Sequence, residues 1–223
     1  MTAKRQILDS IRGSLGRGAL PPSRRAELEE ALNHPHAAAV PARGTLPHPE
    51  QIALFMAMCV EMSASVDRVA SMALVPAAIA SYLASQNLPT RLVVAPAPQA
   101  LDWAAAPLLE TRFGAALPID PVSVTPVAAG VAETGTLVLC SGPDSPTTLN
   151  FLPDTHIAVI EAGQVVGGYE EVWARLRVDG RLVPRNINMI TGPSRTGDIE
   201  QTILLGAHGP RRLHVILVDE HGG

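Results

Sequence analysis

The sequence predicts an α/β fold in which a mostly parallel sheet is flanked by helices. Along residues 49–223, short apolar runs typical of strands alternate with longer runs of helical periodicity, which indicates βαβ units. Several of the short runs are unbroken Val, Ile and Leu, as expected of strands that are covered on both faces. Because 47% of the residues are hydrophobic and only 3% are aromatic, the core has to be built mainly from Ala, Val, Leu and Ile.

Strands and helices can be placed along this domain from their periodicity. The expected strands are residues 66–69, 92–94, 122–127, 134–140, 157–160, 186–190 and 213–218. The expected helices are residues 50–62, 76–85, 169–176 and 198–205. Pro126 predicts that its strand lies at an edge of the sheet, because proline cannot donate a hydrogen bond to a neighbouring strand.

Residues 1–48 are expected to form a helical arm and linker. Apolar residues fall on one face of a helix over residues 4–15, and the Pro-Pro-Ser sequence that follows opens a second helix. The stretch 33–49 is rich in Pro, His, Ala and Gly, which is typical of an extended linker. The arm is therefore expected to pack loosely or on a partner, and residues 49–223 to form the α/β domain.

Composition argues against several classes of function. The net charge is −4 and no basic cluster is interleaved with aromatic residues, so a nucleic-acid partner is not expected. No apolar run reaches the ~18 residues of a membrane span, and the first residues do not form a signal-peptide core. Cys59 and Cys140 show no CxxC spacing, and the histidines show no metal-ligand spacing. We therefore expect a cytoplasmic protein without a membrane partner, a metal site or a cofactor of its own.

The first candidate site is the segment 190–200, between an expected strand and an expected helix. A sharp turn into a helix leaves backbone N–H groups free, and these groups together with the helix dipole attract a carboxylate or phosphate. The predicted anion-binding residues are Thr191, Gly192, Ser194, Arg195 and Thr196. An ordinary turn is the open alternative, because Asp198 and Glu200 would themselves satisfy the dipole.

The second candidate site is the sequence Glu133-Thr134-Gly135-Thr136, which precedes an apolar strand. Glu133 is a candidate general base or nucleophile, Thr134 and Thr136 are candidate ligand-binding hydroxyls, and Gly135 would let a ligand approach the backbone. The alternative is a solvated loop carboxylate with threonines that pair across strands. His156, which begins a strand, is a further ligand-binding candidate or a structural hydrogen-bonding residue. Whether the two candidate sites converge depends on strand direction, which remains open.

Four motifs in order resemble a known family. The segments 132–138, 152–157, 190–200 and 206–217 are similar to the LUD domain of the lactate utilization protein C family (LutC or YkgG). The likeness covers about residues 50–219. It implies a fold of the NagB/RpiA/CoA-transferase-like kind and a role in oxidising L-lactate to pyruvate with iron–sulfur partner subunits. Family members often carry a basic residue before the Leu-Pro-x-x-His motif; residues 145–150 have none, which predicts a weaker or rearranged anion site.

Two functions follow as expectations. The first is a cluster-free subunit or accessory protein of the lactate-oxidising system, which binds a small carboxylate or phosphate and leaves the iron–sulfur clusters to its partners. The second is a stand-alone enzyme acting on a small phosphorylated or acyl substrate, as an isomerase or a CoA-transferase-like enzyme with Glu133 as its candidate catalytic residue. The second rests on analogy between folds, and a fold alone does not determine a function.

Overall fold

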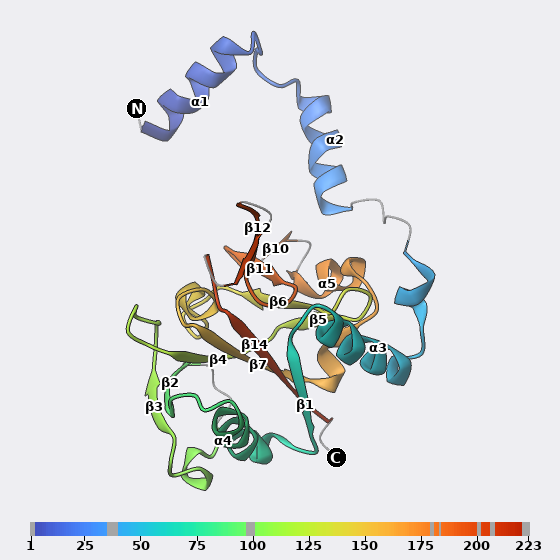
Figure 1. Ribbon diagram of the computed structural model, residues 1–223. Coiled ribbons are helices and arrows are strands. Elements are labelled where there is room, and N and C mark those ends of the chain that lie inside the picture. The colour runs from blue at the N-terminus through green and yellow to red at the C-terminus, as the bar shows by residue number, and fades with distance from the viewer. Residues whose placement is uncertain are drawn as a thin grey trace. The chain divides into compact units, whose positions relative to one another are not determined.

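The computed structural model describes residues 3–34, 40–96, 101–178, 181–182, 184–199, 202–205 and 208–219. The chain separates into two compact units (Figure 1). The first contains the helices α1 (Ala3–Ser14) and α2 (Pro22–Asn33), and the second contains the α/β domain. Within the described residues, no helix is both long and apolar enough to cross a membrane.

The α/β domain is built on a six-stranded sheet with every neighbouring pair parallel, which confirms the predicted fold class. The order is β1-β14-β7-β4-β2-β3. The bounds are β1 Ser65–Val69, β14 Arg212–Val218, β7 Thr155–Glu161, β4 Val122–Pro126, β2 Arg91–Val94 and β3 Glu110–Phe113.

The edge position predicted for β4 is wrong, because β4 lies between β7 and β2. Pro126 is the last residue of this strand, and the pairing of β4 with β2 already ends at Val124 opposite Val94. The next residue, Val127, donates its N–H to the Val159 carbonyl of β7, so the N–H position of Pro126 faces the β2 side, past the end of that pairing. The missing N–H therefore removes no bond from the ladder, and the proline is tolerated inside the sheet.

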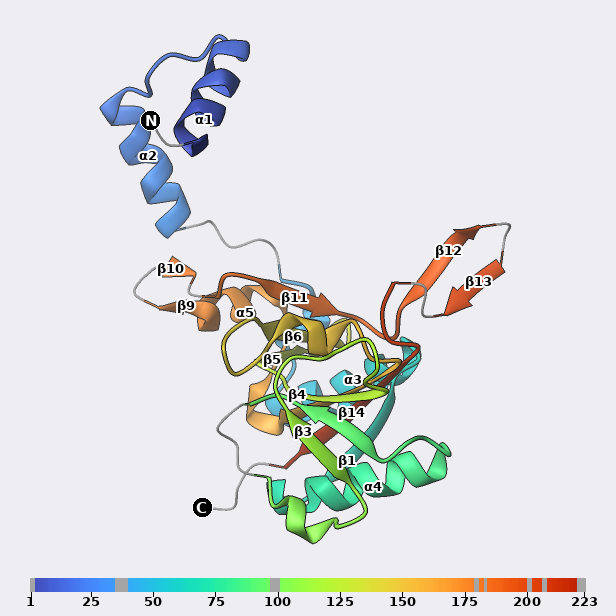
Figure 2. The same ribbon diagram turned by 90° about the vertical axis from the view of Figure 1, so that its left-hand side faces the viewer.

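Two hydrophobic cores cover the parallel sheet, one on each face, because alternate strand residues point to opposite faces. On one face, Ile160 of β7 and Val215 of β14 pack with α3 (His48–Glu61) and a second sheet. On the other face, Val159 and Ile216 pack with α4 (Val75–Ser85) (Figure 2). Short 3-10 helices lie in the connections between the main elements: η1 Ala42–Thr45, η2 Met72–Leu74, η3 Trp103–Ala105, η4 Thr147–Asn150 and η5 Ala162–Gln164.

The second sheet is mixed and has the order β11-β6-β5-β8. Its bounds are β11 Ile187–Ile190, β6 Thr136–Cys140, β5 Ala129–Val131 and β8 Val165–Val166. β6 is antiparallel to both β11 and β5, whereas β5 is parallel to β8. The helix α5 (Tyr169–Leu176) follows β8, and the short strands β9 (Arg177–Val178) and β10 (Arg181–Leu182) pair with each other.

The helix predicted over residues 198–205 is wrong. This part of the chain forms an antiparallel pair of strands, β12 (Arg195–Ile199) and β13 (Thr202–Leu205). Its composition favours strands locally, since Thr196, Ile199, Thr202 and Ile203 are all β-branched. The segment after residue 194 is therefore a strand, and the described chain offers no helix N-terminus there.

Candidate functional site

Four hydroxyl groups meet at the second sheet and form a continuous hydrogen-bonded cluster. The Thr136 Oγ1 atom lies 2.7 Å from Thr134 Oγ1, 2.8 Å from the Tyr169 hydroxyl and 2.7 Å from Thr191 Oγ1. The Tyr169 hydroxyl also lies 3.1 Å from Thr134 Oγ1. Each hydroxyl has one proton to donate and can accept from its neighbours, so the cluster satisfies itself.

Strand direction brings the two predicted sites together. β6 and β11 are antiparallel, and Ile190 at the end of β11 lies opposite Leu137 near the start of β6. Thr191 therefore meets Thr136, although the two residues are 55 positions apart in the sequence. The question of convergence, which the sequence left open, is answered for the threonines of the two segments.

Gly135 and Gly192 both lie against the C-terminal end of α3. Their φ angles are +65° and +79°, values that side chains rarely adopt. A Cβ atom on Gly135 would lie 2.6 Å from the Cys59 backbone nitrogen, and one on Gly192 would lie 2.2 Å from the Met62 carbonyl oxygen. Backbone conformation and helix packing thus account for both glycines without a ligand.

Glu133 is a buried carboxylate at the junction of β8 and α5. It is 7% exposed, its N–H donates to the Gly167 carbonyl at 3.2 Å, and its Oε2 atom is buried without a hydrogen-bond partner. The alternative of a solvated loop carboxylate is therefore wrong. A buried carboxylate oxygen without a partner is energetically costly, so Glu133 remains a candidate functional group.

A cavity of about 210 Å³ lies at the amino ends of β7 and β14, beside the loop that follows β11. Its polar lining residues are Asn150, His156, Ser194 and His208. Its apolar lining includes Phe151, Met189, Ile190, Pro193, Pro210 and Leu213. Ligands in open parallel sheets usually lie at the carboxyl ends of the strands. The cavity instead lies at the opposite end of the parallel sheet, because β11 belongs to the second sheet.

His156 is fully buried in β7 and lines this cavity. Its Nε2 atom lies 2.7 Å from the Thr125 hydroxyl, while its Nδ1 atom has no partner. Burial lowers the pKa of His156 to about 4, so the ring is neutral near pH 7. If the buried Thr125 hydroxyl donates to Nε2, the proton of the ring sits on Nδ1. In that tautomer only the Nδ1–H group lacks a hydrogen-bond partner. In the other tautomer both Nδ1 and the hydroxyl proton of Thr125 would lack a partner.

Asn150 is a cavity residue that the sequence analysis missed. It ends η4, is 2% exposed, and its Oδ1 atom is buried without a partner. The only sequence feature that could have indicated its role is a polar residue between the apolar Leu149 and Phe151, and such a pattern is also typical of an ordinary turn. His208, which also lines the cavity, was considered only as a metal ligand and not as a ligand-binding residue.

The loops that carry Ser194 and His208 are fixed side by side. The Ser194 N–H donates to the Pro210 carbonyl at 2.9 Å, and a Cβ atom on Gly209 would lie 3.2 Å from that of Ser194. The peptide N–H of Ser194 is therefore occupied and is not one of the free donors predicted for a helix start. The loop after β11 contributes Thr191 to the hydroxyl cluster, and Gly192 and Ser194 to the cavity.

Arg195 is not among the residues that line the cavity. Its side chain is exposed, and its Nη2 atom donates to the Ser63 hydroxyl at the end of α3. The side chain of Thr196 lies outside the described residues. The described lining residues include no Lys or Arg, so the polar groups of the cavity are those of Asn150, His156, Ser194 and His208. Among the described residues, no group of three or more His, Cys, Asp and Glu side chains is placed to hold a metal ion.

Comparison with known proteins matches part of this chain to a known domain. A family model, the LUD domain, matches residues 116–218, a range that contains every cavity residue named above. A crystal structure of a DUF162 family protein from Deinococcus radiodurans superposes with a TM-score of 0.56 and 28% identity, covering 78% of this chain and 99% of that one. Residues 116–218 thus match the LUD domain, within a chain of α/β fold.

Individual relatives carry a more specific name than the domain does. Lactate utilization protein C from a Geobacillus species is 40% identical over 93 residues, which cover 40% of this chain and 39% of that protein. Lactate utilization protein C from Bacillus subtilis is 36% identical over 102 residues, which cover 44% and 42%. The matched stretch thus spans about two fifths of the length of these relatives. The resemblance inferred from the four motifs is confirmed.

Proposed function

We propose that this chain is the cluster-free subunit or accessory protein of a system that oxidises L-lactate to pyruvate. It works in the cytoplasm beside iron–sulfur partner subunits and carries no cofactor itself. Its own task is to bind a small anion, such as the substrate carboxylate, in the cavity lined by Asn150, His156 and Ser194.

The observation that carries the proposal is the position of the cavity inside the region matched to the LUD domain, in a chain whose relatives are named for lactate utilization. The cavity also offers chemistry that suits a hydroxy acid. His156 Nδ1 and Asn150 Oδ1 are buried without a partner in residues that line the cavity. With a small rotation of these side chains, a ligand carboxylate would accept from the His156 N–H and a ligand hydroxyl would donate to Asn150 Oδ1. Hydrogen bonds to an ionised carboxylate are stronger than those between neutral groups, which supports anion binding without Lys or Arg.

Filling the cavity tests this placement. Ser194→Leu should lower lactate-dependent dye reduction by the system reconstituted with its iron–sulfur subunits by about tenfold or more, because the larger side chain occupies the ligand volume. Met189→Trp fills the same cavity from another position and should act in the same direction. The matched control is Arg195→Ala, which alters the neighbouring residue outside the cavity and should leave the rate within about twofold.

Dye reduction measured with and without the wild-type chain tests the proposed role itself. If the partner subunits reduce the dye at full rate without this chain, the proposed role is wrong. If they require the chain but Arg195→Ala abolishes the rate and Ser194→Leu does not, the role stands and the anion site is the surface near Arg195. Thermal unfolding of each variant separates a lost site from a lost fold.

The burial of Glu133 favours one second candidate, a stand-alone enzyme acting on a phosphorylated or acyl substrate. Glu133 is not among the residues that line the cavity, so the two functions make opposite predictions. We expect Glu133→Gln, which keeps the shape of the side chain, to leave lactate-dependent dye reduction within about twofold of wild type. A carboxylate nucleophile cannot be replaced by an amide, so loss of turnover of a CoA ester or sugar phosphate in this variant would establish the enzyme instead.

A further inference from the structure

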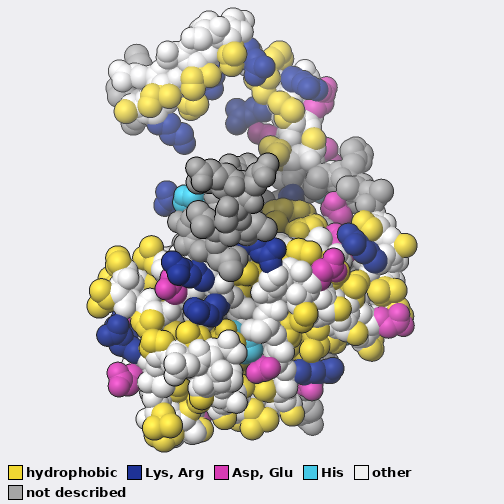
Figure 3. All heavy atoms as spheres, viewed as in Figure 1, with side chains coloured by type: hydrophobic (Ala, Val, Ile, Leu, Met, Phe, Trp, Pro, Cys, Tyr) yellow, Lys and Arg dark blue, Asp and Glu magenta, His cyan; other side chains and the backbone are white. Residues whose placement is uncertain are grey.

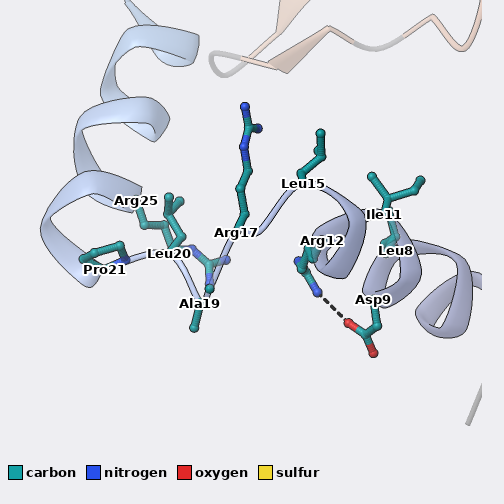
Figure 4. Close-up of a pocket in the computed structure, with 11 residues that line it drawn as sticks. Leu8, Asp9, Ile11, Arg12, Leu15, Arg17, Ala19, Leu20, Pro21 and Arg25 are labelled. Atoms are coloured by element: carbon teal, nitrogen blue, oxygen red, sulfur yellow. Dashed lines mark hydrogen bonds and ion pairs between the residues drawn. The ribbon is translucent and has the colours of Figure 1, made fainter.

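The first unit of the chain presents a groove beside α1. The groove has a volume of about 1,070 Å³ and is formed by α1, the segment that follows it and the start of α2 (Figure 4). Neither helix buries any of its side chains. A helix normally gains most of its stability by burying an apolar face, so two helices without a buried residue indicate that a contact surface is left uncovered.

The groove has an aliphatic centre. Leu8 and Ile11 lie on one face of α1, Leu15 follows directly after the helix on the same side, and Leu20 adds a fourth apolar side chain from the connecting segment. Ile11 is 50% exposed and Leu15 is 57% exposed. Space-filling spheres show apolar side chains in a row along this arm (Figure 3). Covering such a row with another apolar surface is favourable because it removes apolar area from water.

Arginines border this aliphatic centre. Arg12, Arg17 and Arg25 line the groove together with Asp9. Arg12 pairs with Asp9 at 2.9 Å and Arg25 pairs with Glu29 at 2.9 Å, both at exposed positions where a partner's carboxylates can compete. Figure 4 shows Arg17 extended to the same side as Ile11 and Leu15. Residues 3–25 contain six Lys or Arg residues and a single acidic residue, Asp9. The local excess of positive charge contrasts with the net charge of −4 of the whole chain. The groove therefore combines an apolar centre with a basic border.

We infer that this groove binds an acidic amphipathic helix of another protein. An apolar groove between structural elements accepts a helix that inserts aliphatic side chains at i, i+3, i+4 and i+7 spacing, and glutamates on the flanks of that helix would face the arginines. The 12 residues of α1 set the length of the contact at about 18 Å, or three turns of the bound helix. The inference does not depend on the proposed role in lactate oxidation.

Two other occupants fit less well. A second copy of the arm would bring a second set of groove arginines toward the first, and like charges repel. A lipid surface binds a helix that presents one flat apolar face. Here the apolar side chains are divided between α1 and the following segment and line a concave groove, which suits a cylinder of helical dimensions.

The experiment titrates the full chain into a fluorescein-labelled model peptide and follows fluorescence anisotropy. The peptide is an acidic helix with leucines at i, i+3, i+4 and i+7 and glutamates on its flanks. We expect saturable binding that weakens with added salt, because the charges are exposed to solvent. Arg17→Glu should weaken binding by about tenfold, while Arg24→Glu, an equal charge change outside the groove lining, should change it by about twofold or less. Ile11→Ser should weaken binding, with Leu32→Ser as its apolar control outside the lining.

Several results would overturn the inference. They are an absence of binding up to roughly millimolar peptide, equal binding of a scrambled peptide of the same charge, or equal loss with Arg17→Glu and Arg24→Glu. Binding to phosphatidylglycerol vesicles without binding to the peptide would assign the groove to a membrane surface. Concentration-dependent dimerisation in sedimentation experiments that Ile11→Ser abolishes would assign it to a second copy of the chain.

Discussion

Gly167→Ala is expected to lower the free energy of unfolding by about 3–5 kcal/mol, more than the typical cost of a single substitution. Gly167 follows β8, and its backbone crosses that of Gly44 in η1. A Cβ atom on Gly167 would lie 1.7 Å from the Gly44 carbonyl oxygen and 3.0 Å from Gln51 Nε2. A backbone carbonyl cannot rotate away as the tip of a side chain can, so η1 or the start of α5 has to move.

The same substitution should disturb the surroundings of Glu133. The Gly167 carbonyl accepts from the Glu133 N–H, and the Gly167 N–H donates to Glu171 Oε1 at 2.9 Å. Urea denaturation measures the effect, and Gly142→Ala is the matched control because nothing lies within 4 Å of its Cβ position. The control should change stability by less than about 0.5 kcal/mol. A loss for Gly167→Ala as small as that of the control would contradict the close crossing of the two backbones.

The parallel sheet could be predicted from the sequence because each of its apolar strands is a local signal. Unbroken apolar runs such as residues 157–160 and 215–218 are buried on both faces, and the pattern needs no knowledge of the neighbouring strand. The position of β4 could not be predicted in the same way. Pro126 argues for an edge only if its nitrogen, which carries no hydrogen, faces a paired strand, and that depends on where the pairing with β2 ends.

The candidate site shows the same division between local and non-local information. Thr136 and Thr191 were both identified from their local sequence, but their meeting depends on the antiparallel register of β6 and β11. The anion site at a helix start depended on a helix after residue 197, and that helix is replaced by β12 and β13. Asn150 escaped notice because burial of a turn residue is decided by packing from distant parts of the chain.

His156 and His214 should make the protein sensitive to acid. Burial lowers the pKa of each histidine from 6.5 to about 4, and for His214 the nearby Asp67 carboxylate opposes the shift. Both rings sit in fixed surroundings. His156 is bonded to Thr125, and His214 is bonded through Nδ1 to the Ser65 hydroxyl at 2.8 Å and stacked on Tyr82 at 3.7 Å between ring centroids.

The direction of the effect follows from proton binding. Between pH 6.5 and about 4, the unfolded chain takes up a proton at each histidine while the folded chain does not, so acid favours unfolding. Stability from these two groups is fully present above pH 6.5 and is lost as the pH falls toward 4. At 1.36 kcal/mol per pKa unit, each histidine accounts for a loss of up to about 3 kcal/mol. The loss for His214 is the smaller if Asp67 draws closer to the charged ring.

Urea unfolding between pH 7 and pH 4.5 should therefore show a steep decline in stability with acidification, and His156→Gln should reduce the slope. Glutamine keeps a polar group facing Thr125 but cannot take up the proton. The control is Val93→Ala, a buried substitution without a titrating group, which should lower stability at every pH while leaving the slope unchanged. If His156→Gln and Val93→Ala have parallel curves, His156 is not the neutral, buried base that lines the cavity. The pKa of His156 would then lie near its unfolded value of 6.5, and the hydrogen bonding argued for the cavity would change with pH in that range.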